Sequence, residues 1–359
     1  MSRVLLLVPR MNIGGAETYV FTVAKGLKQR GHEVFVASAG GQLADKLETY
    51  GIKTIFLPVR FNIKLAAHLL SRIVKKYAID IIHANSGDAG CVAALVKRQT
   101  NIKVVYTAHG LFGDYQREYI INEVDKIICV SNFVKQKALA QNFTESKLVT
   151  CYCGVDLERF TANQDVRAVL RKKYGISEDT LVLAIVSRIK NLSHKGHQDL
   201  FKILKDYAPQ ADWRLMVIGK GKGLLKLKWT VYKMGLQQRV LVLGHRTDVE
   251  YLLNMADLLV LPTNFETFGL VLAEAMAMQK PAIAYSVGGT PEVINDGQTG
   301  YLIEHHNLQA MYKRIKYLDE HRDVLKKMST AARSWVAQNF DNKTMLDQIE
   351  NIYQEVLSK

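Results

Sequence analysis

The chain has 359 residues, which is enough for two domains of ordinary size. Hydrophobic residues make up 48% and charged residues 23%, a balance that excludes a disordered, collagenous or coiled-coil chain. Four cysteines are too few for a disulfide framework, and no apolar run reaches the roughly 20 residues that a membrane span needs. We therefore expect a cytoplasmic protein.

The net charge of +14 is the one composition figure that departs from the average. Residues 1–100 hold 14 basic and 6 acidic side chains, so more than half of the excess lies in less than a third of the chain. Such an excess suits an anionic partner, such as lipid, nucleic acid or an acidic substrate. A soluble basic surface explains it equally well.

Short apolar runs alternate with amphipathic stretches along nearly the whole chain. The first part predicts helices such as Glu17–Gln29 and Leu65–Tyr77 between strands at Val4–Val8, Glu33–Ala37, Thr54–Leu57, Ile79–His83, Lys103–Thr107 and Lys126–Val130. The pattern restarts after residue 180, with strands at Leu181–Val186, Arg214–Ile218, Val240–Leu243, Leu258–Leu261, Pro281–Ala284 and Tyr301–Ile303. Strands this apolar, alternating with helices, are typical of parallel sheets covered on both faces. The sequence therefore predicts an α/β protein with two doubly wound domains in tandem.

The seam between the domains is marked by Gly154–Gly175, a polar stretch without a strand pattern. We expect an N-terminal domain over residues 1–160 and a C-terminal domain over 161–335. From Leu308 onward the pattern is helical, and residues 336–359 should bury their apolar side against the N-terminal domain. Ligands of parallel sheets bind at the carboxyl ends of the strands, so we expect the site in a cleft where the two domains face each other.

Three glycine clusters follow predicted strands and precede helices. Gly14-Gly15 would let backbone N–H groups approach an anion at a helix start, although a tight turn is the commoner reason for such a pair. Gly219-Lys-Gly221-Lys-Gly223 lacks the last glycine of the dinucleotide fingerprint, so a turn with solvated lysines explains it better than NAD binding. Helix initiation accounts for Gly288-Gly289 before Pro291.

Charged residues follow two of the later strands. Arg188 and Lys195 share the loop after Leu181–Val186, where a guanidinium and an ammonium together suit a diphosphate; solvated loop cations are the alternative. Glu266 lies in the loop after Leu258–Leu261, and Glu274 lies in the helix that begins near Gly269. A carboxylate can hold a neutral diol, such as a sugar or a ribose, by two hydrogen bonds.

Two histidines lie at the ends of predicted strands in the first domain. His109 follows Lys103–Thr107, and His83 ends Ile79–His83 with weaker support. A single histidine in such a place is more often structural than catalytic.

Several of these motifs, taken together, resemble one enzyme family. Glu266-x-Phe268-Gly269 with Glu274 eight residues on, then Pro281 and Gly288-Gly289-x-Pro-Glu, is similar to the pattern of retaining nucleotide-sugar glycosyltransferases of family 4, which have the two-Rossmann fold called GT-B. Further agreement comes, in chain order, from Gly14-Gly15-Ala-Glu, Arg30-Gly-His-Glu-Val34, Gly154-Val-Asp-x-x-x-Phe160 and Arg188 with Lys195-Gly196. The resemblance covers nearly the whole chain and implies a GT-B fold, with the C-terminal helix crossing back to the first domain.

The resemblance also implies a role for each matching residue. Arg188 and Lys195 would bind the donor diphosphate, and Glu274 would bind the ribose hydroxyls. Glu266 would contact the donor sugar and phosphate together with the backbone of Phe268, Gly269 and Leu270. Gly15 would approach the phosphate from the first domain, and His109 would contact the transferred sugar. The catalytic set is then His109, Arg188, Lys195 and Glu266.

Two departures from the family pattern lie beside Arg188. The residue before it is Ser187 where glycine is usual, and the loop from Arg188 to Lys195 is longer than in most members. Lys190 is therefore the alternative to Lys195 as the second cation.

The sequence contains no Asp-x-Asp motif, so we expect neither a metal nor another cofactor. Arg188, Lys195 and the helix start at residues 269–271 would stabilise the leaving diphosphate instead. The resemblance implies retaining hexosyl transfer from a nucleotide-diphosphate donor, a UDP-sugar foremost, to a hydroxyl of a glycan or lipid-linked acceptor in cell-surface polysaccharide biosynthesis. A nucleotide-sugar epimerase of the same fold, or a non-catalytic protein that binds nucleotides or glycans, is the alternative.

A basic helix in the first domain is a candidate surface for contact with a membrane. The stretch Leu65–Tyr77 has basic side chains on or near one face: Lys64, His68, Arg72, Lys75 and Lys76. Together with the charge of residues 1–100 and the family resemblance, this face predicts a peripheral contact with anionic lipid on the inner side of the plasma membrane. A solvated basic face of an ordinary helix is the alternative. We expect no nucleic-acid partner.

Overall fold

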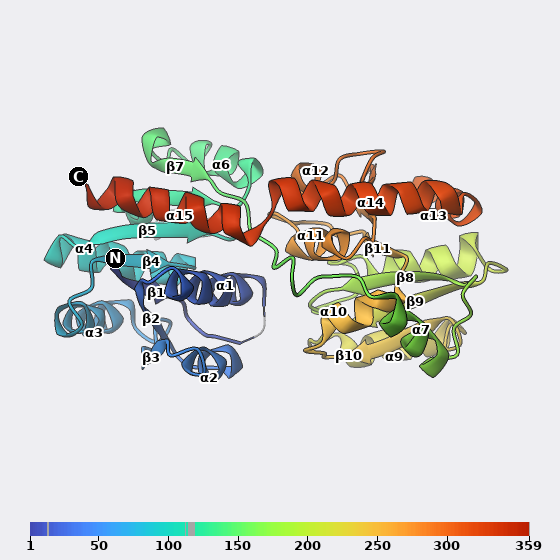
Figure 1. Cartoon of the computed structure of the whole chain (residues 1–359), viewed down its shortest axis with the longest axis horizontal. Helices are drawn as coiled ribbons and strands as arrows, with labels where there is room; N and C mark the ends of the chain where they lie inside the picture. The colour runs from blue at the N-terminus through green and yellow to red at the C-terminus, as the bar shows by residue number, and fades with distance from the viewer. Residues whose placement is uncertain (13, 112, 114–118, 359) are drawn as a thin grey trace. The chain divides into compact units, whose positions relative to one another are not determined.

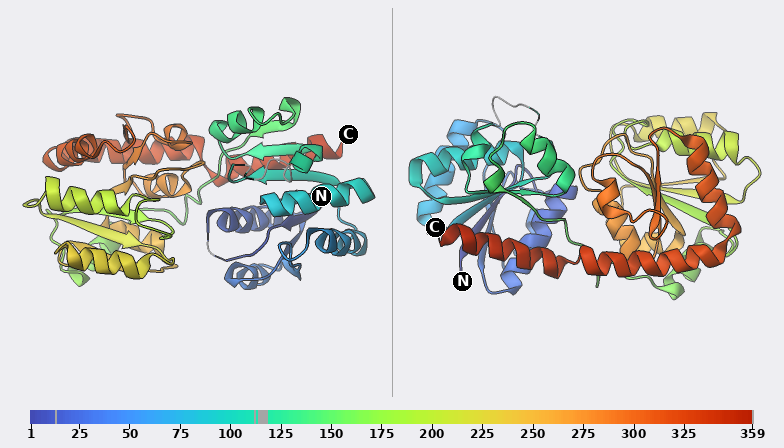
Figure 2. Two further views of the ribbon diagram at one scale, coloured as in Figure 1. Left: turned by 180° about the vertical axis from the view of Figure 1, so that it is seen from behind. Right: turned by 90° about the horizontal axis from the view of Figure 1, so that it is seen from above.

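A computed structural model describes the chain except for residues 13, 112, 114–118 and 359. It divides into two compact units, the first made of Met1–Gly154 and Asn342–Lys359 and the second of Val155–Asp341. Each unit holds one parallel sheet flanked by helices (Figure 1, Figure 2). The predicted fold class, two doubly wound α/β domains, is therefore confirmed. The chain passes between the units at Gly154–Val155 and again at Asp341–Asn342, each about six residues from the boundary expected at residues 160 and 335.

The sheet of the first unit has, in its described part, the spatial order β3-β2-β1-β4-β5-β6-β7. Its strands are β1 (Arg3–Leu7), β2 (Glu33–Ser38), β3 (Lys53–Phe56), β4 (Ile81–Ala84), β5 (Lys103–Ala108), β6 (Lys126–Cys129) and β7 (Leu148–Thr150). The helices are α1 (Gly15–Gln29), α2 (Gln42–Glu48), α3 (Ile63–Lys76), α4 (Gly87–Thr100), α6 (Asn132–Leu139) and α15 (Asn342–Leu357), with the short turns η1 (Tyr119–Glu123) and η2 (Glu145–Lys147). The sequence missed β7, because three residues at a sheet edge are too few for a periodic pattern.

Alternate residues of β5 show how the two faces of this sheet are covered. Tyr106 contacts the α4 side, where a Cβ on Gly90 would lie 3.0 Å from its ring. The next residue, Thr107, points to the opposite face, because side chains alternate along a strand. There its hydroxyl lies 2.6 Å from His83 Nε2, and His83 Nδ1 lies 2.6 Å from the hydroxyl of Tyr353 in α15. The C-terminal helix therefore covers the face opposite α4.

Charged side chains hold the other end of α15 to the first unit. Arg30 donates to Asp347 at 2.6 Å and forms an ion pair with Glu350, and His32 Nε2 lies 2.9 Å from the same glutamate. Gly26 in α1 leaves the space that the side chain of Leu346 occupies, since a Cβ there would lie 2.3 Å from Cδ1. These contacts explain why residues 342–357 belong to the first unit.

The sheet of the second unit has the order β10-β9-β8-β11-β12-β13 over the described residues. Its strands are β8 (Leu181–Val186), β9 (Trp213–Ile218), β10 (Val240–Gly244), β11 (Leu258–Leu261), β12 (Ala282–Tyr285) and β13 (Gly300–Ile303). The helices are α7 (Gln164–Lys173), α8 (His197–Lys202), α9 (Leu224–Lys233), α10 (Val249–Leu252), α11 (Leu270–Ala277), α12 (Thr290–Val293), α13 (Leu308–Glu320) and α14 (Arg322–Asn339), with short turns η3 (Ile203–Tyr207) and η4 (Leu253–Met255). Across the described parts of both units, no helix combines the length and the hydropathy needed to cross a bilayer.

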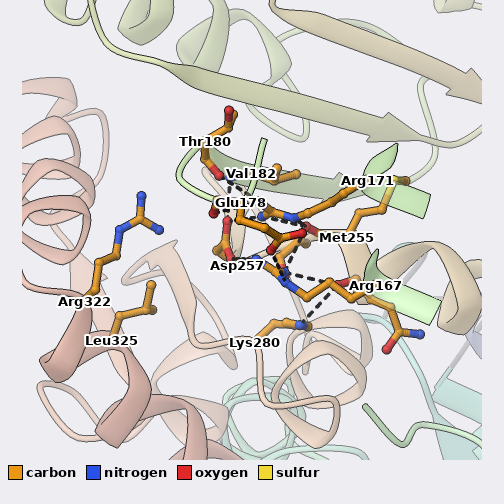
Figure 3. A network of polar contacts seen from close by, with 12 residues as sticks. Arg167, Arg171, Glu178, Thr180, Val182, Met255, Asp257, Lys280, Arg322 and Leu325 are labelled. Carbon is orange, nitrogen blue, oxygen red and sulfur yellow. Dashed lines mark hydrogen bonds and ion pairs between the residues drawn. The ribbon is translucent and has the colours of Figure 1, made fainter. Parts of the chain in front are cut away.

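The predicted seam contains α7, which is bonded to the second unit by a buried ionic network (Figure 3). Asp257 accepts from Arg167 and Arg171, each at 2.7 Å, and from the backbone N–H of Val182 at 2.7 Å. Arg171 is buried, and its remaining donors reach backbone carbonyls around it. Lys280 lies beside this group, and burial lowers its pKa from 10.5 to about 8, helped by the charge of Arg167. Residues 164–173 are therefore an integral part of the second unit and not a free linker.

Candidate functional site

In the second unit, β9, β8, β11 and β12 lie side by side and run parallel. Their carboxyl ends therefore share one edge of the sheet, the usual ligand edge of this fold class. The loops that leave this edge carry Arg188 and Lys195 after β8, and Glu266 and Gly269 after β11. The structure thus brings these predicted site residues to one edge.

The glycines after β9 shape the loop that carries Arg188. A Cβ on Gly219 would lie 1.9 Å from the carbonyl oxygen of Ser187, and one on Gly221 would lie 2.1 Å from that of Ile189. Both glycines also have φ angles near +155°, at +157° and +153°, which side chains disfavour. The N–H of Ile189 in turn donates to the carbonyl of Lys220 at 2.9 Å. The cluster is therefore a backbone support for the Arg188 loop, which explains its glycines without a dinucleotide.

The loop that carries Glu266 is supported in the same way. A Cβ on Gly288 would lie 1.8 Å from the carbonyl oxygen of Glu266, and one on Gly289 would lie 2.2 Å from that of Thr267. The N–H of Gly289 donates to the Glu266 carbonyl at 3.0 Å. Helix initiation alone does not explain this glycine pair, because the close approach of the Glu266 loop requires it.

The Arg188 loop and the Glu266 loop are also joined to each other. Gly196 has a φ of +75°, and a Cβ there would lie 2.0 Å from the carbonyl oxygen of Pro262. The carbonyl of His194 accepts from Asn264 N–H at 3.0 Å and from the Thr263 hydroxyl at 3.2 Å. Successive loops along this edge therefore hold one another by backbone contacts.

An ion pair connects two of the predicted site residues. Lys195 Nζ lies 2.6 Å from Glu266 Oε2, with only 17% and 19% of the two side chains exposed. Arg188 is exposed, and within the described residues it makes neither an ion pair nor a hydrogen bond. Lys190 is exposed as well. An arriving diphosphate would meet Arg188 directly and would compete with Glu266 for Lys195.

Ser187, which stands where the family pattern has glycine, has a hydrogen-bonding partner in α8. Its hydroxyl lies 3.3 Å from Nε2 of His197, the first residue of α8. Burial, together with the charge of Lys195, lowers the pKa of His197 to about 4, so this ring is neutral at pH 7. Ser187 therefore helps to seat the start of α8 behind the loop.

The helix α11 starts at the same edge. Gly269 precedes it with a φ of +96°, and the first-turn N–H groups of a helix have no partners within it. The ring of Phe268 is buried against Phe340, with ring centroids 5.4 Å apart, so only its backbone can serve a ligand. The positive end of the helix dipole favours an anion here.

Glu274 lies in the second turn of α11 in a setting different from that of Glu266. Burial raises its pKa to about 7, the charge of Arg159 lowers it and that of Glu250 raises it. Arg159 itself donates to Glu250 at 2.9 Å. Sequence reasoning missed Arg159, although it lies inside the motif that runs from Gly154 to Phe160.

In the first unit, the predicted residues Gly15 and His109 follow β1 and β5, which flank β4 in the sheet. Gly14 is extended, with φ −176°, and Gly15 is the first residue of α1, so no tight turn explains the pair. A Cβ on Gly15 would meet nothing within 4 Å among the described atoms. This leaves room for a ligand to approach the helix start.

His109 is oriented by Asn85, a residue that sequence reasoning did not select. The amide of Asn85 donates to the carbonyl of His83 at 2.9 Å, so its oxygen faces His109 Nε2 at 3.2 Å. This orientation of the Asn85 amide assigns the proton of neutral His109 to Nε2. The ring meets Tyr19 edge-on at 4.7 Å, and burial lowers the pKa of His109 to about 3. At pH 7 His109 is a neutral hydrogen-bonding group.

His83, the weaker candidate, has a structural role. It is completely buried between Thr107 and Tyr353, and burial lowers its pKa to about 3. No cluster of three or more histidine, cysteine, aspartate or glutamate side chains that could hold a metal ion occurs among the residues that the structure describes.

Two protein-family models match the chain. The model described as Glycosyltransferase Family 4 matches residues 13–159, and the one described as Glycosyl transferases group 1 matches residues 166–335. A solved structure of a glycosyltransferase from Rickettsia africae ESF-5 is 28% identical, with a TM-score of 0.89 over 99% of this chain and 98% of that one.

Two curated relatives show what similar chains do. N-acetyl-alpha-D-glucosaminyl L-malate synthase of Bacillus anthracis is 28% identical over 96% of this chain and 95% of its own length. UDP-Gal:alpha-D-GlcNAc-diphosphoundecaprenol alpha-1,3-galactosyltransferase of Escherichia coli is 24% identical over 89% and 87% of the two lengths. The acceptors in these names differ, one an organic acid and the other a lipid diphosphate.

Proposed function

Because this chain belongs to the family 4 glycosyltransferases of the GT-B fold, we propose that it transfers a hexosyl residue from a UDP-sugar to a hydroxyl of a glycan or lipid-linked acceptor. The transfer would retain the anomeric configuration and need no metal. The observation that carries the proposal is the edge of the second sheet, where Arg188, Lys195 and the start of α11 gather. The name of the E. coli relative supports both a UDP-sugar donor and a lipid-linked acceptor.

The leaving group sets the electrostatic demand on this edge. When the bond between the sugar C1 and the phosphate oxygen breaks, its electron pair stays on the diphosphate, which becomes more negative. Arg188, Lys195 and the first-turn N–H groups of α11 are the groups proposed to stabilise that charge. A charge-assisted contact is worth about 1.5–3 kcal/mol, so losing Arg188 should slow transfer roughly ten- to a hundredfold.

The carboxylates are proposed to hold neutral hydroxyl groups of the donor. Glu274 would accept two hydrogen bonds from the ribose diol when it is ionised. Glu266 would turn to the sugar once the diphosphate takes over its partner Lys195. The ion pair would then act as a placeholder that the donor displaces.

In the first unit, Gly15 is proposed to approach the phosphate and His109 to contact the transferred sugar. Because the pKa of His109 is about 3, this ring would position the sugar by hydrogen bonding and would not supply a proton at pH 7. For retention, the acceptor oxygen would bond to C1 on the face that the diphosphate leaves. The acceptor proton would then pass to the departing phosphate oxygen, so that no side chain need serve as the base.

A screen of UDP-, GDP- and ADP-sugars by thermal unfolding tests the donor, since a bound donor raises the unfolding temperature. We expect UDP-sugars to stabilise the protein, Arg188→Ala to reduce the effect, and Lys172→Ala, on the exposed side of α7, to leave it intact. NMR of the product should show a retained anomeric configuration. Failure of every UDP-sugar to bind, or activity that a chelator removes and Mg²⁺ or Mn²⁺ restores, would overturn the proposal; sugar interconversion without acceptor would indicate an epimerase.

For a lipid-linked acceptor, we propose a peripheral contact with anionic membrane through α3. The basic side chains of its predicted face are exposed, while Ala66, Leu70 and Val74 are buried. Phe56, the last residue of β3, and Phe61, on the loop that leads into α3, are exposed by 74% and 83%. Binding to liposomes that does not depend on their anionic lipid content would refute this contact.

A further inference from the structure

The helix α9 in the second unit has an exposed apolar stripe. Leu225, Trp229 and Tyr232 are 80%, 58% and 70% exposed. They are four and three residues apart, so they lie on one face of the helix. Leu227 and Val231 point the other way and are buried. The helix (Figure 1) is therefore apolar toward the core and apolar toward solvent.

Lysines surround this stripe. At 100° per residue, Lys228 lies on one side of it and Lys226 and Lys233 lie on the other. All three are exposed, as is Lys222 just before the helix, and none forms an ion pair among the described residues. From Trp213 to Thr247 the sequence has eight lysine or arginine residues and no aspartate or glutamate. The surface is thus an aromatic and aliphatic stripe bordered by cations.

We propose that this face of α9 docks on an anionic lipid bilayer. Tryptophan and tyrosine side chains favour the membrane interface, leucine inserts toward the acyl chains, and lysines at the border meet anionic headgroups. A single-stranded nucleic acid would fit less well, because it needs a basic groove lined by ring faces, and Leu225, at the N-terminal end of the stripe, has no ring. The charge of the face also opposes pairing with a second copy of the same face.

The position of α9 connects this docking face with the candidate donor site of the same unit. The helix begins directly after Gly219–Gly223, which supports the loop of Arg188. Docking would therefore hold that loop close to the bilayer surface, where a lipid-linked acceptor would be found. The inference itself does not depend on the glycosyl transfer, since membrane binding needs neither donor nor acceptor.

Trp229 provides a direct reporter of the docking. The protein has three tryptophans; Trp213 is 1% exposed, and the indole N–H groups of Trp213 and Trp335 donate to Asp319 and to the Val293 carbonyl. We expect vesicles of phosphatidylcholine with about 30% phosphatidylglycerol to shift the emission of the full-length protein to the blue and to protect it from acrylamide, because a negative bilayer surface attracts basic segments. Pure phosphatidylcholine vesicles should do neither, and Trp229→Phe should remove the change.

Paired variants separate this face from the rest of the surface. Leu225→Gln with Tyr232→Gln should weaken co-sedimentation with these vesicles about tenfold or more, and Lys226→Gln with Lys228→Gln about 25-fold. The matched controls lie in α7 and α10 of the same unit: Val169→Gln with Tyr251→Gln for apolar exposure, and Lys172→Gln with Lys173→Gln for charge. Both control pairs should stay within about threefold of the wild type, because distant charges are screened.

Each of the following results would overturn the proposal. If the α9 variant pairs bound vesicles as the wild type does, membrane binding would be left to α3. The proposal would also fail if the protein sedimented with vesicles while the Trp229 emission stayed unchanged. Better protection of Trp229 by a single-stranded oligonucleotide than by the vesicles would indicate a nucleic-acid surface. A blue shift of the Trp229 emission that follows protein concentration without vesicles would indicate self-association.

Discussion

Replacing Glu274 by glutamine tests whether its carboxylate holds the donor ribose. An ionised carboxylate accepts two hydrogen bonds from a diol, whereas a carboxamide or a protonated carboxyl has one good acceptor oxygen. Burial raises the pKa of Glu274 to about 7, against the charge of Arg159 and with that of Glu250. With this pKa, about nine-tenths of the side chain is ionised at pH 8 and about one-tenth at pH 6.

The direction of the pH effect follows from which form binds. Because only the ionised form holds the diol by two bonds, kcat/KM for the donor should rise about tenfold from pH 6 to pH 8, with an inflection near pH 7. In Glu274→Gln this rise should disappear. At pH 8 the variant should lose one charge-assisted hydrogen bond, about 1.5–3 kcal/mol or roughly ten- to a hundredfold in kcat/KM.

Initial rates of UDP release between pH 6 and pH 8 measure this effect, and calorimetry of UDP without acceptor separates binding from chemistry. Arg159→Met should move the inflection above pH 7, because the guanidinium favours ionised Glu274, and Glu250→Gln should move it below. A flat wild-type profile, or a Glu274→Gln profile that keeps the rise, would refute the assignment of Glu274 to the ribose.

Three further changes test the two sites and the core. Glu266→Gln frees Lys195 from its ion pair, so calorimetry should show about tenfold tighter UDP binding, while sugar transfer slows. Weaker UDP binding would contradict the proposed competition between Glu266 and the diphosphate for Lys195. Asn85→Asp places a carboxylate beside the Nε2–H of His109, so an NMR titration should find the imidazole pKa between about 4 and 6. In Asn85→Ala the pKa should stay near 3. Equal pKa values in both variants would show that the Asn85 amide does not face the ring. Lys280→Met removes a buried cation, and burial lowers the pKa of Lys280 from 10.5 to about 8. The free energy of unfolding in urea should therefore rise by about 3 kcal/mol at pH 7, and by less above pH 10, where wild-type Lys280 is neutral when folded. An unchanged stability at pH 7 would refute the cost of burying this charge.

The sheets could be predicted from the sequence because their strands are apolar on both faces. Runs such as Leu181–Val186 have no polar alternation, and only a sheet covered on both sides accommodates them. Parallel order then places the ends of β8 and β11 at one edge, so Arg188, Lys195 and Glu266 could be grouped from the sequence alone. The short edge strand β7 depends on tertiary contacts, and no local pattern announces it.

The partners of the site residues could not be predicted in this way. Lys195 and Glu266 are 71 positions apart, and their pairing depends on how two loops are held by glycine contacts. Arg159 acts on Glu274 across a still larger gap in the sequence, and the orientation of His109 depends on which way one amide faces. Sequence spacing gives the edge at which a side chain lies, whereas its charge state depends on neighbours that only the folded loops bring near.

The glycines near the candidate sites of the two units are required for different physical reasons. In the second unit, Gly219, Gly221, Gly288 and Gly289 each face a carbonyl oxygen of a neighbouring loop at about 2 Å from an added Cβ, so loop packing alone requires them. Gly15 is different, because its backbone is ordinary for the first residue of a helix and an added Cβ would touch nothing that the structure describes. Intramolecular packing among the described residues therefore gives no reason for glycine at this position. The proposed approach of a ligand phosphate to the start of α1 would supply one.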